Sequence, residues 1–219
     1  MSAEQNRGRK ILVCFAVREE AKHFQPPDGV ECKVVVSGIG GRNAERALVS
    51  SLESFAPQLV LTCGYAGGLN PQLAHGTVVF DTDEGTKFAP LLTKALAVPV
   101  KFFCSERIAV TAADKLTLRK QTGADAVEME SGVIRALCQQ RGIPSATIRV
   151  ISDDAGTNLP MDFNRIVGAD GNMNYFKLAA ALARSPSLVP KLMRFQRELD
   201  TASRRLGEAL RELLVGLRS

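Results

Sequence analysis

Short apolar runs that do not alternate with polar residues recur through the first two thirds of the chain. They are rich in Val and Ile and lie at residues 11–17, 32–38, 58–64, 77–81, 100–104 and 146–152. Runs of this kind are typical of strands that are buried on both faces of a sheet. Helical patterns lie between them, at residues 42–55, 112–121 and 131–142. This alternation predicts a three-layer αβα fold of the α/β class, with a mostly parallel or mixed, twisted central sheet.

The end of the chain has a different pattern, which predicts one long amphipathic helix over residues 187–218. Pro190 suits the start of such a helix. The apolar stripe, at spacings of three and four, consists of Leu192, Phe195, Leu199, Ala202, Leu206, Leu210, Leu213 and Leu217. We expect this stripe to dock on the domain or on a partner subunit. Because the helix is also rich in arginine, peripheral contact with an anionic membrane is the alternative; the arginines are Arg194, Arg197, Arg204, Arg205, Arg211 and Arg218.

Composition excludes several classes of protein. With 219 residues, 45% of them hydrophobic, the chain suits one domain over 1–219 with a flexible leader at 1–9. The leader is polar and no apolar run reaches the length of a membrane span, so we expect a cytoplasmic protein. The net charge is +5 with only 5% aromatic residues and no Lys/Arg run in the body of the chain, which does not favour nucleic acid as a partner. Five scattered cysteines and two histidines form no CxxC pair and no metal spacing, so we expect reduced thiols and no metal site.

Candidate functional groups follow the ends of the predicted strands, where ligands bind in open α/β sheets. The segments are AVREEA with Glu20, SGIGGRNA with Gly40 and Arg42, GYAGGL at 64–69, EMES at 128–131 and SDDA at 152–155. EMES follows a further, short predicted strand that contains Ala126 and Val127. The segment GYAGGL comprises Gly64, Tyr65, Ala66, Gly67, Gly68 and Leu69. Its glycines would allow a tight turn whose N–H groups hold an anion, and a purely structural turn is the alternative. Gly40 and Arg42 at a helix start could hold phosphate, although Arg42 could equally be a solvated charge.

The EMES segment places two carboxylates on either side of Met129. In an extended segment, Glu128 and Glu130 leave on the same face. A carboxylate accepts two hydrogen bonds at once, which suits the vicinal diol of a ribose. The alternative is that one glutamate caps the helix that follows.

Ser152, Asp153 and Asp154 end the last predicted strand. An aspartate held among apolar walls can keep a raised pKa and give a proton to a leaving group. Adjacent aspartates cannot both face one site, so one of them is expected to serve a turn or a cap. Arg149, on the same strand, is expected to pair with a carboxylate as a structural element.

The segments GYAGGL, AVEMES and RVISDDA together resemble the purine nucleoside phosphorylase and methylthioadenosine/S-adenosylhomocysteine nucleosidase superfamily, over about Lys10 to Ala155. Three further segments resemble the hopanoid-associated phosphorylase branch of that superfamily: LNPQLAHG, TGADAVEMES and the tail from LARSPSLVPKL onward. The resemblance implies cleavage of the N-glycosidic bond of a purine nucleoside, which in that branch would be an adenosyl lipid. It implies no cofactor, with inorganic phosphate as co-substrate if the reaction is phosphorolysis, and a homodimer or higher homo-oligomer.

The resemblance also assigns roles to residues. Glu130 would bind the ribose 2′- and 3′-hydroxyls, with Met129 packed against the sugar. Asp153, oriented by Ser152, would protonate or hydrogen-bond the purine N7, and Glu20 would lie near an attacking water. Glu128 and the GYAGGL backbone would complete the substrate site, and Gly40, Arg42 and Gly68 would hold phosphate.

Three departures from the nucleosidases concern specificity. Tyr65 stands where they have a small serine, residues 81–105 form a shorter segment, and the chain after Ala155 follows a different pattern. Glu20 favours water and Arg42 leaves phosphate open, so the residues do not decide between hydrolase and phosphorylase. A non-catalytic nucleoside-binding protein on the same fold is the alternative from another class.

Overall fold

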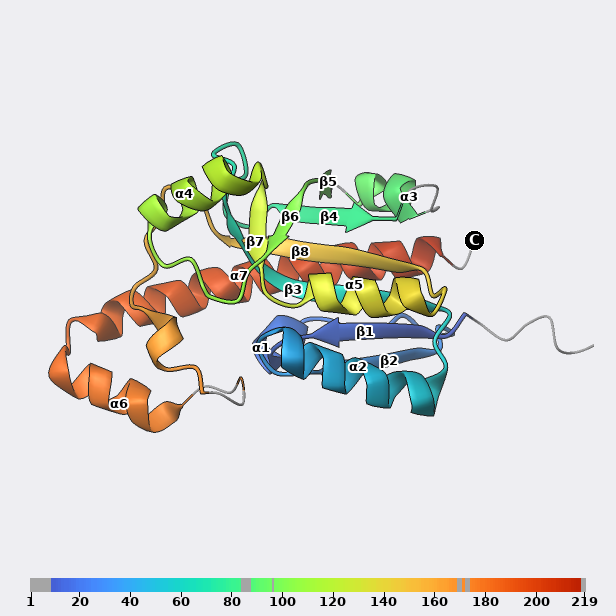
Figure 1. The fold of residues 1–219 in the computed structure, drawn as a ribbon, viewed down its shortest axis with the longest axis horizontal. Coiled ribbons are helices and arrows are strands. Elements are labelled where there is room, and N and C mark those ends of the chain that lie inside the picture. Colours follow the sequence, from blue (N-terminus) through green and yellow to red (C-terminus); the bar gives the residue numbers. More distant parts are fainter. Residues whose placement is uncertain (1–8, 84–87, 96, 169–170, 172–173, 218–219) are drawn as a thin grey trace, which may run out of the picture.

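In the computed structural model of the protein, the described residues form one mixed sheet of eight strands with helices on both faces (Figure 1). The structure describes residues 9–83, 88–95, 97–168, 171 and 174–217. The predicted leader therefore lies outside the described residues except for Arg9, and so does Arg218. The strands are β1 (Ile11–Phe15), β2 (Cys32–Val36), β3 (Leu59–Gly68), β4 (Val78–Thr82), β5 (Val98–Pro99), β6 (Phe102–Cys104), β7 (Ala126–Glu128) and β8 (Ser145–Asp153). The helices are α1 (Arg18–Ala21), α2 (Gly41–Phe55), α3 (Phe88–Lys94), α4 (Ala112–Thr122), α5 (Ser131–Gln140), a 3-10 turn (Phe163–Arg165), α6 (Tyr175–Arg184) and α7 (Leu188–Gly216).

The sheet has the strand order β2-β1-β3-β8-β4-β5, and β7 also pairs with β3 and carries β6. Strands β1, β2, β3 and β8 run parallel to one another, whereas β4 is antiparallel to β8 and β7 is antiparallel to β3. The two longest strands, β3 and β8, lie side by side at the centre, and all nine residues of β8 are buried. The prediction of a mixed α/β sheet with apolar central strands is confirmed.

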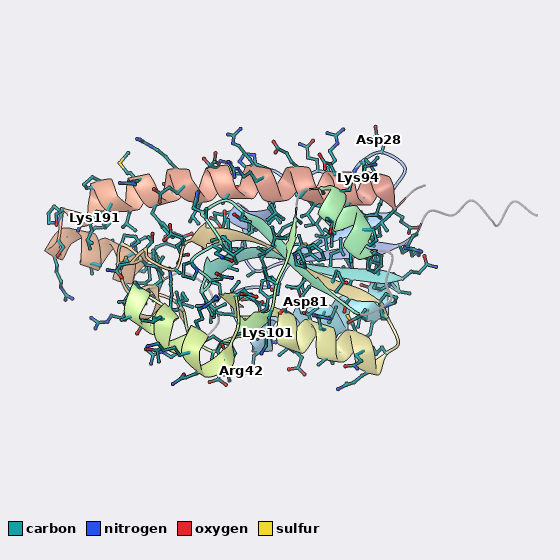
Figure 2. All side chains as sticks on the ribbon, turned by 90° about the horizontal axis from the view of Figure 1, so that it is seen from above. Asp28, Arg42, Asp81, Lys94, Lys101 and Lys191 are labelled. Atoms are coloured by element: carbon teal, nitrogen blue, oxygen red, sulfur yellow. The ribbon has the colours of Figure 1, made fainter. Side chains whose placement is uncertain are left out.

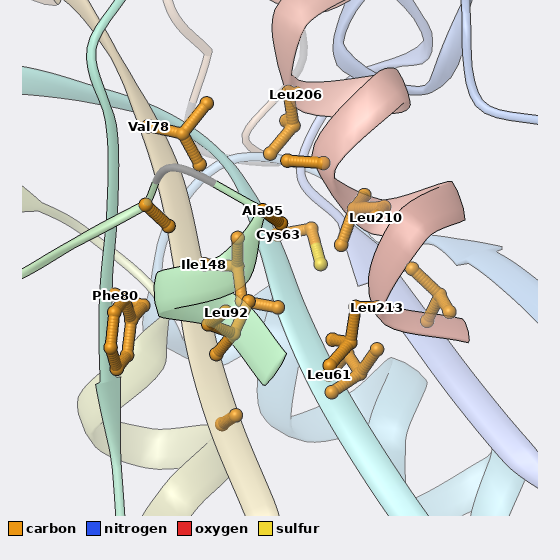
Figure 3. Packing of buried hydrophobic residues seen from close by; sticks show 14 of the residues in the cluster. Leu61, Cys63, Val78, Phe80, Leu92, Ala95, Ile148, Leu206, Leu210 and Leu213 are labelled. Atoms are coloured by element: carbon orange, nitrogen blue, oxygen red, sulfur yellow. The ribbon is translucent and has the colours of Figure 1, made fainter. Parts of the chain in front are cut away.

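Each face of the sheet is covered by different helices. Helices α3 and α7 cover one face, where Leu61 and Ile148 of the sheet pack with Leu210 of α7 (Figure 3). Helices α2 and α5 cover the other face, with Leu48 and Ile134 among the buried residues. Successive strand residues point to opposite faces, so an unbroken apolar run supplies both cores at once.

The long helix α7 docks on the sheet through the second half of its apolar stripe. Ala202, Leu206, Leu210 and Leu213 are completely buried, whereas Leu192 near the start of α7 is only half-buried. The expectation that the stripe docks on the domain is confirmed for this part of the helix. Across the described ranges, no helix combines the length and the apolarity that crossing a bilayer requires.

The segment GYAGGL is not the turn that its glycines suggest. Strand β3 was expected to end at Gly64, but it continues to Gly68, with a bulge against β8 after Ala66. The strand can continue because β7 pairs antiparallel with its last residues, so Gly67 and Gly68 are partners of Val127 and Ala126. This correction matters for the site, since the N–H groups of a paired strand are not arranged around an anion.

Candidate active site

Glu20, on the short helix α1, is a buried carboxylate that three backbone N–H groups hold in place. Its Oε2 accepts hydrogen bonds from Ala16 and Val17, at 2.8 and 3.1 Å, and its Oε1 accepts one from Tyr65 at 2.8 Å. Burial raises the pKa of this carboxyl, against the opposing effects of Arg149 and the N–H groups. A buried carboxylate with a raised pKa suits a group that takes up a proton.

Arg149 is the charge around which the other carboxylates gather. Its side chain is 1% exposed, and its Nη2 donates to Glu128 at 2.6 Å and to Glu130 at 3.3 Å. Its remaining bonds reach the carbonyl of Cys63 at 2.7 Å and the hydroxyl of Thr62 at 3.2 Å. Although burial opposes the charge, the neighbouring carboxylates raise the pKa of the guanidinium, so it stays cationic. The expected pairing of Arg149 with a carboxylate is present, and it lies inside the candidate site.

The two glutamates of EMES have different environments. Glu128 accepts from the N–H groups of Glu130 and Ser131, at 3.0 and 2.7 Å, and from the Ser131 hydroxyl at 2.7 Å. These bonds and Arg149 outweigh burial and lower the pKa of Glu128. Its oxygens hold Arg149 and the start of α5, so the alternative role of Glu128, that of capping this helix, is present in the structure. Its contact with a substrate stays a prediction.

Glu130 is the glutamate that keeps capacity for a ligand. It is the residue before α5, and it accepts from the N–H of Gly40 at 2.9 Å in addition to its contact with Arg149. Burial is the main cause that raises the pKa of Glu130 to about 7. Arg149 opposes this rise, and the repulsion of Glu128 and Glu20 adds to it. A carboxylate has about four acceptor positions, so both oxygens can accept further hydrogen bonds.

Two glycines of β3 explain how these side chains come together. A Cβ at Gly64, whose φ is +149°, would overlap the carboxylate of Glu20. A Cβ at Gly67 would lie 3.2 Å from Cγ1 of Val127 and 3.5 Å from Oδ2 of Asp153. Glycine at these two positions therefore lets side chains from other elements cross the central strand.

Asp153 forms the second polar group, and its partner is a lysine that the sequence reasoning missed. Oδ1 accepts from Ser152 Oγ at 2.5 Å, and Oδ2 lies 2.5 Å from Nζ of Lys115 on α4. The Lys115 side chain is completely buried, and its ammonium also donates to the carbonyls of Asp154 and Thr157, at 2.6 and 2.9 Å. The apolar surroundings that we expected for Asp153 are thus wrong, since a buried ammonium faces it. The only signal in the sequence was Lys115 itself, one of two lysines within the helical pattern of 112–121.

The side chains of three further candidates, Asp154, Tyr65 and Arg42, lie outside these two polar groups. Asp154 accepts from the N–H of Gly156 and from a hydroxyl, and so is the turn residue of the aspartate pair. The Tyr65 side chain contacts α7, where its hydroxyl donates to the carbonyl of Leu199 at 3.1 Å. Arg42 is exposed at the edge of the molecule, in the first turn of α2 (Figure 2).

The other backbone candidates are also placed. Ala66 is buried and its carbonyl accepts from Ser152 Oγ at 3.2 Å, whereas Met129 is half-buried between the two glutamates. Gly68 is paired with Ala126 of β7, and the N–H of Gly40 is bonded to Glu130. The three phosphate candidates, Gly40, Arg42 and Gly68, are therefore not assembled into one anion site.

The two polar groups lie near each other along β3. Arg149 of β8 is the neighbour of Gly64, and Asp153 is the neighbour of Gly67. Three residues of a strand span roughly 10 Å, a length comparable to that of a nucleoside. Glu130, Arg149 and Ser37 are among the residues that line a narrow gap beside the first group, and this gap is too small to hold a water molecule. Within the described residues, no three His, Cys, Asp or Glu side chains are grouped as a metal ion would require.

Comparison with protein families supplies the identity. The family model described as "Phosphorylase superfamily" matches residues 23–90 and 96–184. The chain belongs to the phosphorylase superfamily.

Curated relatives and solved structures agree with this membership. The chain is 28% identical over 174 residues to a 5′-methylthioadenosine/S-adenosylhomocysteine nucleosidase of Anoxybacillus flavithermus, covering 64% of this chain and 75% of the relative. It is 26% identical over 189 residues to the nucleosidase of the same name from Shewanella halifaxensis, covering 70% and 82%.

Two solved structures share the fold. The Colwellia psychrerythraea nucleosidase has a TM-score of 0.70 at 20% identity, with 96% of each chain covered. The Helicobacter pylori futalosine hydrolase has a TM-score of 0.68 at 19% identity, covering 95% of this chain and 98% of its own. The predicted superfamily and fold are thereby confirmed.

Proposed function

We propose that this superfamily member hydrolyses the N-glycosidic bond of an adenosine-type purine nucleoside. Family membership and the nucleosidase relatives support an enzyme that cleaves such a bond. The observation that carries the proposal is the convergence of Glu20 and Glu130 on Arg149 beside Gly64, with Asp153 three residues further along β3. Cleavage passes through an oxocarbenium-like sugar, which nearby carboxylates stabilise electrostatically.

The residues then have separate roles. Glu130 accepts hydrogen bonds from the ribose 2′- and 3′-hydroxyls, and Met129 packs against the sugar. As the C–N bond breaks, its electron pair stays with the purine. The proton that N7 gains comes from the Lys115 ammonium through the Asp153 carboxylate, which leaves the Lys115 amine neutral. Water adds to the sugar carbon and gives its proton to Glu20. Exchange with solvent then returns these groups to their starting charges.

Water is favoured over phosphate as the nucleophile because the donors that phosphate needs are already used. The N–H groups of Ala16, Val17 and Tyr65 hold Glu20, and that of Gly40 holds Glu130. An incoming phosphate would meet carboxylates whose neighbouring cation, Arg149, is already paired with two of them. A neutral water meets no such repulsion.

The finer assignments rest on resemblance. We propose an adenosyl lipid as the substrate, because three segments resemble the hopanoid-associated branch. A homodimer or higher homo-oligomer, which the resemblance implies, stays a prediction. A cytoplasmic location, which the sequence pattern indicates, stays one as well.

The test is chromatography of free adenine after incubation with adenosine, methylthioadenosine and an adenosyl lipid, each with and without phosphate. We expect adenine release that does not depend on phosphate. Release that requires phosphate would contradict hydrolysis. Asp153→Asn should lower turnover roughly 100-fold or more, while nucleoside binding persists. Tight nucleoside binding without release from any substrate would instead support a non-catalytic binding protein.

A further inference from the structure

Helix α6 and the start of α7 form a corner, residues 175–197, where several large apolar side chains are exposed. Helix α6 reads YFKLAAALAR, yet none of its residues is buried. Phe176 is 91% exposed and Tyr175 is 71% exposed, and Met193 of α7 is 52% exposed. The corner lies at one end of the long axis of the molecule, away from the sheet (Figure 1). Exposed aromatic and aliphatic groups in one place indicate a surface that another phase or molecule covers.

The same corner carries positive charge and contains no acidic residue. Its five basic residues are Lys177, Arg184, Lys191, Arg194 and Arg197. None of the chain's 23 acidic residues lies between 175 and 197, so the charge of this corner equals the net charge of +5 of the whole chain. Arg194 pairs with Glu198, just beyond the corner, at 2.9 Å, in an exposed contact that water screens. Lys191 lies at the tip in the second view (Figure 2).

The rest of α7 contrasts with its beginning. Beyond Glu198, Arg204 pairs with Asp200, Arg205 donates to the carbonyl of Gly76, and the apolar stripe is buried against the sheet. Apart from the exposed Arg211, the basic character that we expected along the whole helix is concentrated at its first turns and on α6. These are also the parts whose apolar side chains are exposed.

We propose that the α6–α7 corner is the surface with which this protein contacts an anionic phospholipid membrane. Aromatic and aliphatic side chains enter the boundary between headgroups and acyl chains, while lysines and arginines meet lipid phosphates. A symmetric contact between two copies would bring two strongly basic corners together, which is unfavourable. An anionic bilayer compensates the charge and covers the apolar groups at once. The proposal does not rest on the catalytic function, since a non-catalytic protein with this corner would bind in the same way.

The test is co-sedimentation of the full chain with vesicles of phosphatidylcholine alone or with about one third phosphatidylglycerol. We expect binding only to the anionic vesicles, weakened by salt. The triple variant Lys177→Gln, Lys191→Gln, Arg197→Gln should lower the partition coefficient roughly 100-fold. The matched control removes three exposed charges elsewhere, Arg46→Gln, Lys120→Gln and Arg141→Gln, and should lower it far less.

A fluorescence experiment separates membrane insertion from other contacts. The chain contains no Trp, so Phe176→Trp introduces a single reporter without background. We expect a blue shift with anionic vesicles and quenching by brominated acyl chains, and neither for Leu116→Trp on the exposed side of α4. Absence of vesicle binding, equal loss in the two triple variants, or a blue shift of the Phe176→Trp variant that follows protein concentration without lipid would each overturn the proposal. Light scattering would identify the last outcome as association of copies. Because Phe176 is exposed, its replacement by Trp should not change the stability of the fold.

Discussion

Replacing Lys115 by Met tests whether the buried ammonium holds Asp153. Methionine keeps most of the stem volume, so the change removes the charge and its hydrogen bonds without opening a large cavity. The Asp153 carboxylate is 7% exposed and would lose its cation at 2.5 Å, while the carbonyls of Asp154 and Thr157 would lose a donor. Removing one partner of a buried ion pair costs about 3–5 kcal/mol, because it leaves an uncompensated charge. We expect a loss of that size in the free energy of unfolding.

The double variant distinguishes an ion pair from simple loss of packing. In Lys115→Met with Asp153→Asn, neither charge remains, and the asparagine still accepts from Ser152. We therefore expect the double variant to lose less stability than Lys115→Met alone, with a coupling energy of about 2–3 kcal/mol.

The measurement is urea unfolding at pH 7, followed by far-UV circular dichroism and tyrosine fluorescence, with coincident transitions required for a two-state treatment. The reasoning would be refuted if Lys115→Met lost less than about 1 kcal/mol. It would be refuted equally if the losses of the two single variants simply added in the double variant.

Three further predictions concern the other elements. Gly64→Ala should lower the free energy of unfolding, measured in urea, by roughly 3 kcal/mol or more and should reduce turnover, because the methyl group displaces side chains that cross β3. Gly142→Ala, at a left-handed glycine with nothing within 4 Å, should lose only about 1 kcal/mol in the same urea unfolding. Glu130→Gln should lower kcat/KM at least about 100-fold. Since the folded pKa of Glu130 is raised from 4.5 to about 7, its contribution to stability is present below pH 4.5 and is lost as pH rises through 7, and melts of Glu130→Gln between those values should lack this slope. Leu210→Ala, at a completely buried position of α7, should lose about 2–5 kcal/mol in urea unfolding, whereas Val215→Ala on the exposed side should change it by less than about 0.5 kcal/mol.

Local pattern was sufficient for most of the fold. The apolar runs at 11–17 and 146–152 became β1 and β8, and the helical pattern at 131–142 became α5. Such runs predict buried strands well, because a strand buried on both faces carries apolar residues at successive positions and does not alternate them with polar ones. The error at Gly64 arose because glycine is ambiguous in sequence: it permits a turn, and it also permits another side chain to cross a strand.

The candidate site was predictable in its residue types and less so in its contacts. Glu20, Glu130 and Asp153 could be singled out because each lies just beyond the end of a predicted strand. That Glu128 would cap α5 and Lys115 would face Asp153 depends on pairings between segments far apart in the chain.

The sequence by itself determined which segments form strands and helices, and which acidic residues stand at the ends of the strands. Those features depend on hydrophobic periodicity and on neighbours within a few residues. Only the tertiary structure decided which carboxylate keeps free acceptors, which cation neutralises which anion, and which end of α7 stays uncovered. These depend on distances between segments and on exclusion of water, because a charge is stabilised or penalised by the groups that surround it in space.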